Sequence, residues 1–275
     1  MPPIDRTVRV NGLGLHYVEW GRPDGPAVVL LHGITGHARV WDTLAARLED
    51  RYRVLALDQR GHGDSDAPED ADYRISTMAE DVEGFAKTLG LGRFDLIGHS
   101  MGGRVAIAYA AEHLARLRRL VLVDIGPQIN PIGLKRVRDL MVDSPERIES
   151  EEWAYDYLRR ANPLYDPAEL RHRIRHALKP LPGGGFAWKY SKGLTDMMRE
   201  GRRDPIDLWP ALGRISRPAL LVRGAESDIL SPEAAKKMIT VLPAGRLVEV
   251  AEAAHTVPGD QPEEFARIIR SFLDG

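Results

Sequence analysis

The feature that most constrains this fold is an alternation of short apolar runs with longer amphipathic stretches. The apolar runs have strand length, as expected for strands buried on both faces: residues 27–31, 54–57, 94–97, 120–123, 219–222 and 247–250. Between most of them, and after the last, apolar residues recur with helical periodicity: residues 40–48, 78–89, 102–117, 232–242 and 262–273. This order predicts an α/β fold with a mostly parallel, doubly wound sheet.

The chain opens with a predicted hairpin. Residues 7–10 and 13–19 alternate in polarity and are joined by Asn11-Gly12, two residues that tolerate positive φ. With this antiparallel pair, the predicted sheet has about eight strands.

One region interrupts the alternation. Between residues 127 and 207 no buried strand is convincing, and PLPGGG at 180–185 is typical of a loop. Three stretches of this region have helical periodicity: residues 134–143, 145–161 and 167–178. We therefore predict a core domain made of residues 1–126 and 208–275, and a helical cap over residues 127–207, inserted between the sixth and seventh core strands.

Composition excludes several classes of protein. The 275 residues are 43% hydrophobic and 28% charged, with a formal net charge of −2, which is ordinary for a globular protein and predicts no nucleic-acid partner. The absence of cysteine excludes disulfides, thiolate metal sites and a cysteine nucleophile. No apolar run is long enough to span a bilayer and no leader is evident, so we expect a cytoplasmic protein without a membrane partner. The sequence leaves the oligomeric state open between a monomer and a dimer.

Residues 98–102, Gly-His-Ser-Met-Gly, lie directly behind a predicted strand and before a predicted helix. They match G-x-S-x-G, the sharp turn that raises a serine hydroxyl above an α/β sheet, although the same serine could simply cap the helix. A serine hydroxyl becomes a nucleophile only when a base removes its proton, and that base needs a third group to orient it. The interpretation of Ser100 as a nucleophile therefore depends on a histidine and an acid at neighbouring strand ends.

His255 follows the last predicted strand and is the candidate base. Three acids follow predicted strands: Asp228, Asp124 and Glu226. We favour Asp228, because its spacing to His255 and its GAESD context suit the third member of a triad; Asp124, at the end of the strand 120–123, is the main competitor.

The segments LLHGITG, ALDQRGHGDSD, LIGHSMGG, LVRGAESDILSP and AEAAHTVPGDQP resemble, in this order, signatures of the α/β-hydrolase fold superfamily, in particular its cap-bearing, cofactor-free esterase and hydrolase branch. The resemblance covers residues from about 8 to 126 and 214 to 275 and is much more specific for fold than for substrate. A serine at the nucleophile position argues against the aspartate-dependent epoxide hydrolases and dehalogenases of this superfamily. The resemblance implies that no cofactor is needed.

The resemblance also implies an oxyanion hole made by the backbone N–H groups of Ile34 and Met101. Other positions are expected to shape the loop or to let the helix approach the sheet: His32, Gly33, His99, Gly102 and Gly103. The expected activity is that of a carboxylesterase acting on a small-molecule ester through an acyl-enzyme. Two alternatives remain: hydrolysis of a lactone, amide or carbon–carbon bond in a carboxylate-bearing metabolite, and a small-molecule receptor on the same fold.

Other histidines receive weaker interpretations. His62 is expected to hold a loop. His172 and His176 are four positions apart and could share a helix face as metal ligands, but no carboxylate with matching spacing completes the set, so we predict no metal site. A solvated basic face is the simpler interpretation, and the binding of a substrate carboxylate by cations of the cap stays open.

Overall fold

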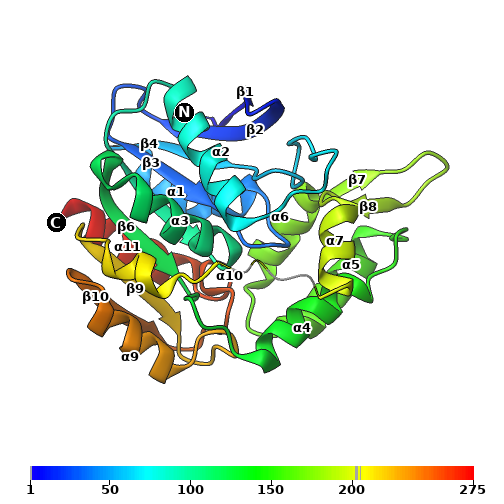
Figure 1. The fold of residues 1–275 in the computed structure, drawn as a ribbon. Helices are drawn as coiled ribbons and strands as arrows, with labels where there is room; N and C mark the ends of the chain where they lie inside the picture. The colour runs from blue at the N-terminus through cyan, green and yellow to red at the C-terminus, as the bar shows by residue number, and fades with distance from the viewer. Residues whose placement is uncertain (1, 202–203, 205) are drawn as a thin grey trace.

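A single mixed sheet organises the molecule (Figure 1). The structure is a computed structural model that describes residues 2–201, 204 and 206–275. The eight strands lie in the order β1-β2-β4-β3-β5-β6-β9-β10; β1 pairs antiparallel with β2 and β2 with β4, and all other pairs are parallel. Their bounds are β1 Ile4–Val10, β2 Leu13–Gly21, β3 Ala27–Leu31, β4 Arg53–Leu57, β5 Phe94–His99, β6 Leu117–Val123, β9 Ala219–Gly224 and β10 Gly245–Val250. The predicted mostly parallel sheet of about eight strands is confirmed.

Helices cover both faces of the sheet because the strands between them are apolar on both sides. One apolar cluster joins the sheet to α2 (Ile75–Thr88), α3 (Met101–Glu112) and α9 (Pro232–Val241). The other joins it to α1 (Asp42–Leu48) and α11 (Pro262–Asp274). Shorter helices are η1 (Ala38–Trp41), η2 (Leu114–Arg116), α8 (Trp209–Gly213) and α10 (Val257–Asp260).

The predicted helix over residues 102–117 is too long. Helix α3 ends at Glu112, and Leu117 already pairs with Phe94 in the sheet. Leu114, Leu117 and Leu120 have helical spacing in the sequence, but Leu117 and Leu120 are buried as strand residues. Periodicity cannot separate a buried strand from a helix end when both are apolar.

The segment between β6 and β9 lies beyond one end of the sheet, as the green and yellow ribbon of Figure 1 shows. Before the short helix α8, it contains the helices α4 (Pro131–Val142), α5 (Glu151–Ala161), α6 (Pro167–Ala177) and α7 (Lys192–Arg199). The side chain of the residue before each helix accepts a hydrogen bond from a backbone N–H of the first turn, which explains where the helices begin: Asn130, Ser150, Asp166 and Ser191.

This segment also contains a hairpin that the sequence analysis did not predict. Strands β7 (Leu178–Pro180) and β8 (Phe186–Trp188) pair antiparallel, and PLPGGG includes the turn between them. Strands of three residues are too short to show alternation. The helices predicted for this segment are present, whereas its division from the core as a cap over residues 127–207 stays a prediction. Within the part of the chain that the structure describes, no helix is both long and apolar enough to cross a bilayer.

Candidate active site

Ser100 occupies a strained turn between β5 and α3. Its φ of 52° lies in the left-handed region that non-glycine residues rarely adopt. A Cβ on Gly98 would lie 2.3 Å from the carbonyl oxygen of Gly102, and a Cβ on Gly102 would lie 2.4 Å from that of Leu31. The two glycines of the G-x-S-x-G motif are therefore required because strand and helix approach too closely for any side chain.

A hydrogen-bonded relay connects Ser100 to a buried acid through His255. His255 Nε2 lies 2.9 Å from Ser100 Oγ, and His255 Nδ1 lies 2.8 Å from Asp124 Oδ2. An ionised carboxylate only accepts, so Nδ1 carries the proton and Nε2 is free to accept the serine hydroxyl. Asp124 is fully buried and His255 is 6% exposed. The sequence predicted Ser100 and His255 as partners, and the structure brings them together.

The carboxylate of Asp124 is held by two further donors. The backbone N–H of Gly224 donates to Oδ1 at 3.0 Å, and the hydroxyl of Ser227 donates to Oδ2 at 2.5 Å. A buried carboxylate requires such donors to remain charged. Ser227 was missed in the sequence because a single serine in a loop carries no motif.

The predicted contact between Asp228 and His255 is corrected by the structure. Asp228 instead accepts two hydrogen bonds from the guanidinium of Arg136 on α4, at 2.6 and 2.8 Å. Burial raises the pKa of Asp228, but Arg136, together with His255 and a backbone hydrogen bond, outweighs this effect, so the pKa lies below its usual value. The reason is topological: β6 lies beside β5 and ends at Val123, directly before Asp124. Asp228 instead lies on the loop between β9 and α9, where Arg136 of α4 contacts it. Glu226 is exposed.

The loop after β3 is fixed by buried histidines. His32 Nδ1 donates to the carbonyl of Gly33 at 2.8 Å, and its Nε2 accepts the N–H of Gln59 at 3.1 Å. Burial lowers the pKa of His32 to about 3, so it is neutral at physiological pH. His62 lies 2.8 Å through Nε2 from the carbonyl oxygen of Ile34, which agrees with the loop-holding role expected for it.

Gly33 and His99 support the serine turn from the side. A Cβ on Gly33 would lie 3.0 Å from His99 Nδ1 and 3.2 Å from Ser100 Cβ, so only glycine fits easily. His99 Nε2 donates to the backbone carbonyl of His255 at 2.9 Å, and burial keeps its pKa well below the usual value. His99 is therefore a neutral donor that positions the backbone of His255. Ile34 and Met101 both line cavities beside Ser100, and the oxyanion role of their N–H groups stays a prediction.

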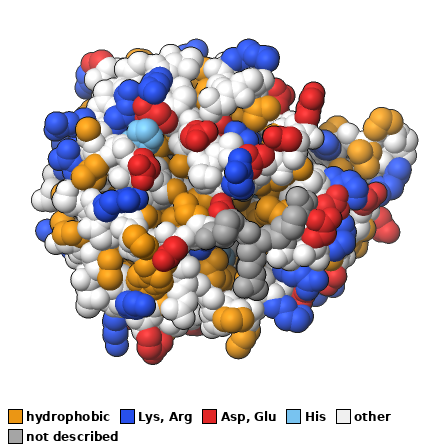
Figure 2. Space-filling view, viewed as in Figure 1, with side chains coloured by type: hydrophobic (Ala, Val, Ile, Leu, Met, Phe, Trp, Pro, Cys, Tyr) orange, Lys and Arg blue, Asp and Glu red, His pale blue; other side chains and the backbone are white. Residues whose placement is uncertain are grey.

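Two cavities have Ser100 in their lining. The first, the polar compartment, has a volume of about 60 Å³ and is lined by Ser100, His255 and four polar side chains from the segment between β6 and β9: Arg136, Asn162, Tyr165 and Arg173. The second, the apolar compartment, has a volume of about 370 Å³ and is lined mainly by aliphatic and methionine side chains. On the face of the molecule that Figure 2 draws, hydrophobic side chains gather in the hollow near the middle. Both linings expose mainly apolar atoms, and the polar compartment differs in the polar and charged side chains that it presents beside Ser100.

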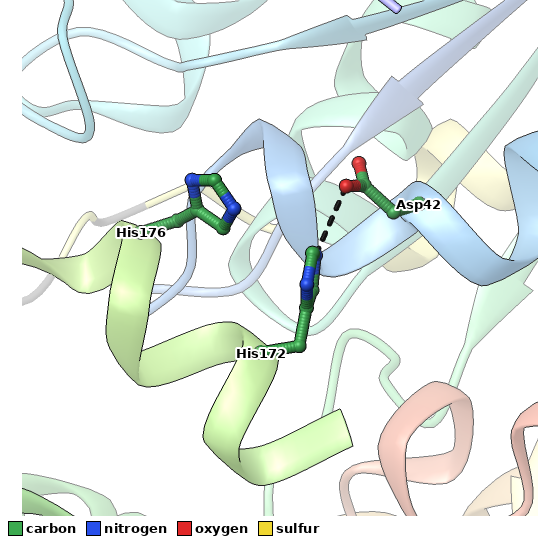
Figure 3. A group of neighbouring side chains, drawn as sticks. All are labelled: Asp42, His172 and His176. Atoms are coloured by element: carbon green, nitrogen blue, oxygen red, sulfur yellow. Dashed lines mark ion pairs between the residues drawn. The ribbon is translucent and has the colours of Figure 1, made fainter. Parts of the chain in front are cut away.

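A possible metal cluster lies between α1 and α6 (Figure 3). Asp42 supplies the carboxylate that the sequence did not place beside His172 and His176, and one ligand atom of each residue lies within 4.8 Å of the others. Asp42 Oδ2 and His172 Nε2 are only 2.9 Å apart, whereas two ligands of one tetrahedral ion are separated by about 3.3 Å. The group is therefore an ion pair with a neighbouring histidine. This pairing raises the pKa of His172.

Comparisons with known proteins agree with this geometry. A family model described as alpha/beta hydrolase fold matches residues 26–177. The chain is 32% identical to 2-(acetamidomethylene)succinate hydrolase of Mesorhizobium japonicum over 98% of its own length and 95% of the relative's. It is 30% identical to N-formylmaleamate deformylase of Pseudomonas putida, covering 97% and 95% of the two chains. The crystal structure of E-2-(acetamidomethylene)succinate hydrolase superposes with a TM-score of 0.91 at 31% identity over 100% of both chains.

Proposed function

This chain belongs to the α/β-hydrolase fold family, and we propose that it is a serine hydrolase that cleaves carboxylic esters through an acyl-enzyme. The observation that carries the proposal is the relay from Ser100 through His255 to Asp124. A nucleophile, a base and an orienting acid at these distances are the requirements for activating a serine hydroxyl.

In the acylation half-reaction, Ser100 Oγ attacks the ester carbonyl carbon while His255 Nε2 takes its proton. The resulting tetrahedral oxyanion would accept hydrogen bonds from the N–H groups of Ile34 and Met101. His255 then protonates the leaving alcohol, and the carbon–oxygen bond to it breaks. Asp124 stays ionised throughout, since it only orients and stabilises the imidazolium.

In the deacylation half-reaction, a water molecule attacks the acyl-enzyme. His255 removes one proton from this water and later returns it to Ser100 Oγ, which regenerates the free enzyme. The apolar compartment offers a place for an aliphatic acyl chain, because its lining exposes mainly carbon and sulfur atoms to the cavity.

A second candidate function is hydrolysis of an amide bond in a carboxylate-bearing metabolite. The relatives named above are named for 2-(acetamidomethylene)succinate and N-formylmaleamate, compounds that combine an amide with carboxylate groups. The same relay would serve this reaction, with His255 protonating the leaving nitrogen instead of an alcohol. Arg173, a buried cation in the polar compartment, favours a substrate with a carboxylate over an uncharged amide.

The direct test is steady-state hydrolysis of 4-nitrophenyl acetate, butyrate and octanoate by the wild type and by Ser100→Ala. We expect the variant to lose at least about 10⁴-fold in kcat, because the relay has no nucleophile. Ser216→Ala, at an exposed position, is the matched control and should behave as the wild type. Equal activity of wild type and Ser100→Ala would refute the proposal. Inactivity of both toward esters and carboxylate-bearing amides, with tight ligand retention, would favour a receptor.

A further inference from the structure

Arg173 is a buried cation beside the catalytic relay. It lies on α6, is 6% exposed, and lines the polar compartment together with Ser100 and His255. Placing a charged group away from water costs free energy unless other groups compensate it. Its hydrogen-bond and ion-pair partners therefore show whether another group of the protein neutralises its charge.

Within the described part of the chain, the charge of Arg173 has no counter-ion. Its Nη2 donates to the backbone carbonyl and to the hydroxyl of Thr35, at 3.0 and 2.8 Å, and both acceptors are neutral. Its Nε is buried and has no hydrogen-bond partner. Among the described residues, none forms an ion pair with it. The guanidinium carbon lies 5.7 Å from the ring centroid of Tyr165, which is also a neutral neighbour.

Other arginines around the site differ in this respect. Arg136, in the same compartment, is neutralised by the carboxylate of Asp228. Arg104 lines the apolar compartment together with Asp204, whose negative charge acts on it. The polar compartment thus carries one uncompensated positive charge, and Arg173 is its source.

We propose that Arg173 binds a carboxylate of the substrate in the polar compartment while Ser100 attacks a carbonyl group of the same molecule. This inference rests on the proposed function and specifies its substrate class: an acid that also contains the ester or amide bond to be cleaved. A carboxylate would satisfy the unpartnered Nε and supply the missing negative charge. Arginine suits this role because its planar fork matches carboxylate geometry and stays charged when buried.

The size of the compartment limits the substrate further. Arg173 and Ser100 line the same compartment, whose volume is about 60 Å³, so the carboxylate and the scissile group belong to one small molecule. The remaining part of the molecule would extend into the apolar compartment, which shares Ile34, Ser100 and Val137 with the polar one.

The test compares anionic esters with their neutral methyl-capped counterparts. One pair carries the charge on the alcohol side (3-carboxy-4-nitrophenyl butyrate) and the other on the acyl side (4-nitrophenyl hydrogen adipate). We expect the wild type to prefer the anion of at least one pair by about 30-fold in kcat/KM, as expected for charge-assisted hydrogen bonds. In Arg173→Met this preference should fall to about 3-fold or less. Arg173→Lys, which keeps the charge but loses the fork, should be intermediate.

Arg175→Met is the matched control, because Arg175 lies on the same helix and is exposed. It should retain the full preference for the anion. A loss in Arg173→Met that is equal for anionic and neutral esters would overturn the proposal and leave Arg173 as a clamp on the Thr35 loop. Equal rates of the wild type on both members of each pair would also overturn it, whether or not Arg173→Met folds.

A binding measurement separates this inference from the proposed function. Calorimetric titration of Ser100→Ala with adipate should give an affinity at least about 10-fold higher than that of Ser100→Ala/Arg173→Met. If the wild type hydrolyses no ester but this difference appears, the carboxylate site stands and the proposed function fails. If neutral esters are hydrolysed and the difference is absent, the hydrolase stands and the carboxylate site is refuted.

Discussion

The ends of β6 and β9 each place an aspartate near the candidate base, yet the two aspartates have different environments. Asp124, at the end of β6, is fully buried and accepts hydrogen bonds from Gly224, Ser227 and His255. Asp228, on the loop after β9, is 31% exposed at its side chain and is paired with Arg136. The comparison teaches that strand-end position alone does not select the acid, whereas the donors around each carboxylate do.

The two loops also cooperate. Ser227, the residue before Asp228, turns its hydroxyl toward Asp124 and accepts N–H bonds from Ile229 and Leu230. The loop after β9 therefore supplies a donor to the relay instead of the acid. Asp228, on the same loop, pairs with Arg136 of α4. Residues of α4 line both the polar and the apolar compartment.

The largest expected effect concerns Asp124. Asp124→Asn removes the charge that orients His255 and stabilises its cation, so we expect kcat to fall by roughly 10⁴-fold with 4-nitrophenyl butyrate. Circular dichroism should show an unchanged fold, since asparagine has the same shape. A comparable loss in Asp228→Asn, with near-normal activity in Asp124→Asn, would show that Asp228 and not Asp124 is the acid that orients His255.

The next largest effect is expected at Ser227, the residue of the loop after β9 whose hydroxyl donates a hydrogen bond to Asp124. Ser227→Ala removes one charge-assisted hydrogen bond, and we expect kcat/KM to fall by about 10- to 100-fold. KM should change little, because Ser227 is not among the residues that line the two compartments at Ser100. Ser216→Ala serves again as the control. Unchanged kinetics in Ser227→Ala would mean that two donors are enough for Asp124.

A smaller effect is expected for Asp228 itself. Asp228→Asn breaks the bidentate pair with Arg136 without touching the relay, so activity toward 4-nitrophenyl butyrate should stay within about 5-fold of wild type. The same variant frees a second positive charge in the polar compartment and should not weaken binding of an anion. A loss above 100-fold on the neutral ester would show that Asp228 acts in catalysis.

The smallest effect is on stability as a function of pH. The pKa of Asp228 is lowered in the folded protein, so its contribution is present above the unfolded value of about 3.9 and is lost as pH falls through the folded pKa. We expect Asp228→Asn to be less stable than wild type by at most about 1 kcal/mol at pH 7. The gap should close below about pH 4 in urea titrations. A gap that persists at low pH would point to lost packing and not to the ion pair.

Much of the fold was predictable from local patterns. The strand runs, the hairpin at Asn11-Gly12 and the helices α4, α5 and α6 follow from periodicity and turn chemistry, whereas α7 was not predicted. The predictions failed where local signals were short or ambiguous, at the end of α3 and in the hairpin β7–β8. Ser100 and His255 were predictable because one lies in a motif and the other follows the last strand.

The identity of the acid needed the tertiary structure. Asp124 and Asp228 both follow buried strands, and the sequence does not state which strand lies beside the nucleophile or where a loop turns. The order β5-β6-β9 brings Asp124 into contact with His255, and α4 draws Asp228 away through Arg136. The ion pair between Asp42 and His172 likewise joins two helices that are distant in sequence, so it too could not be predicted from a local pattern.

By itself, the sequence determined the alternating architecture and the sharp turn at Ser100, because periodicity and glycine requirements are properties of neighbouring residues. Only the tertiary structure decided which acid contacts His255 and that Arg173 has no ion-pair partner among the residues that the structure describes. Those outcomes depend on donors, burial and opposite charges contributed by segments far apart in the chain. Such contacts are set by packing, and no local pattern encodes them.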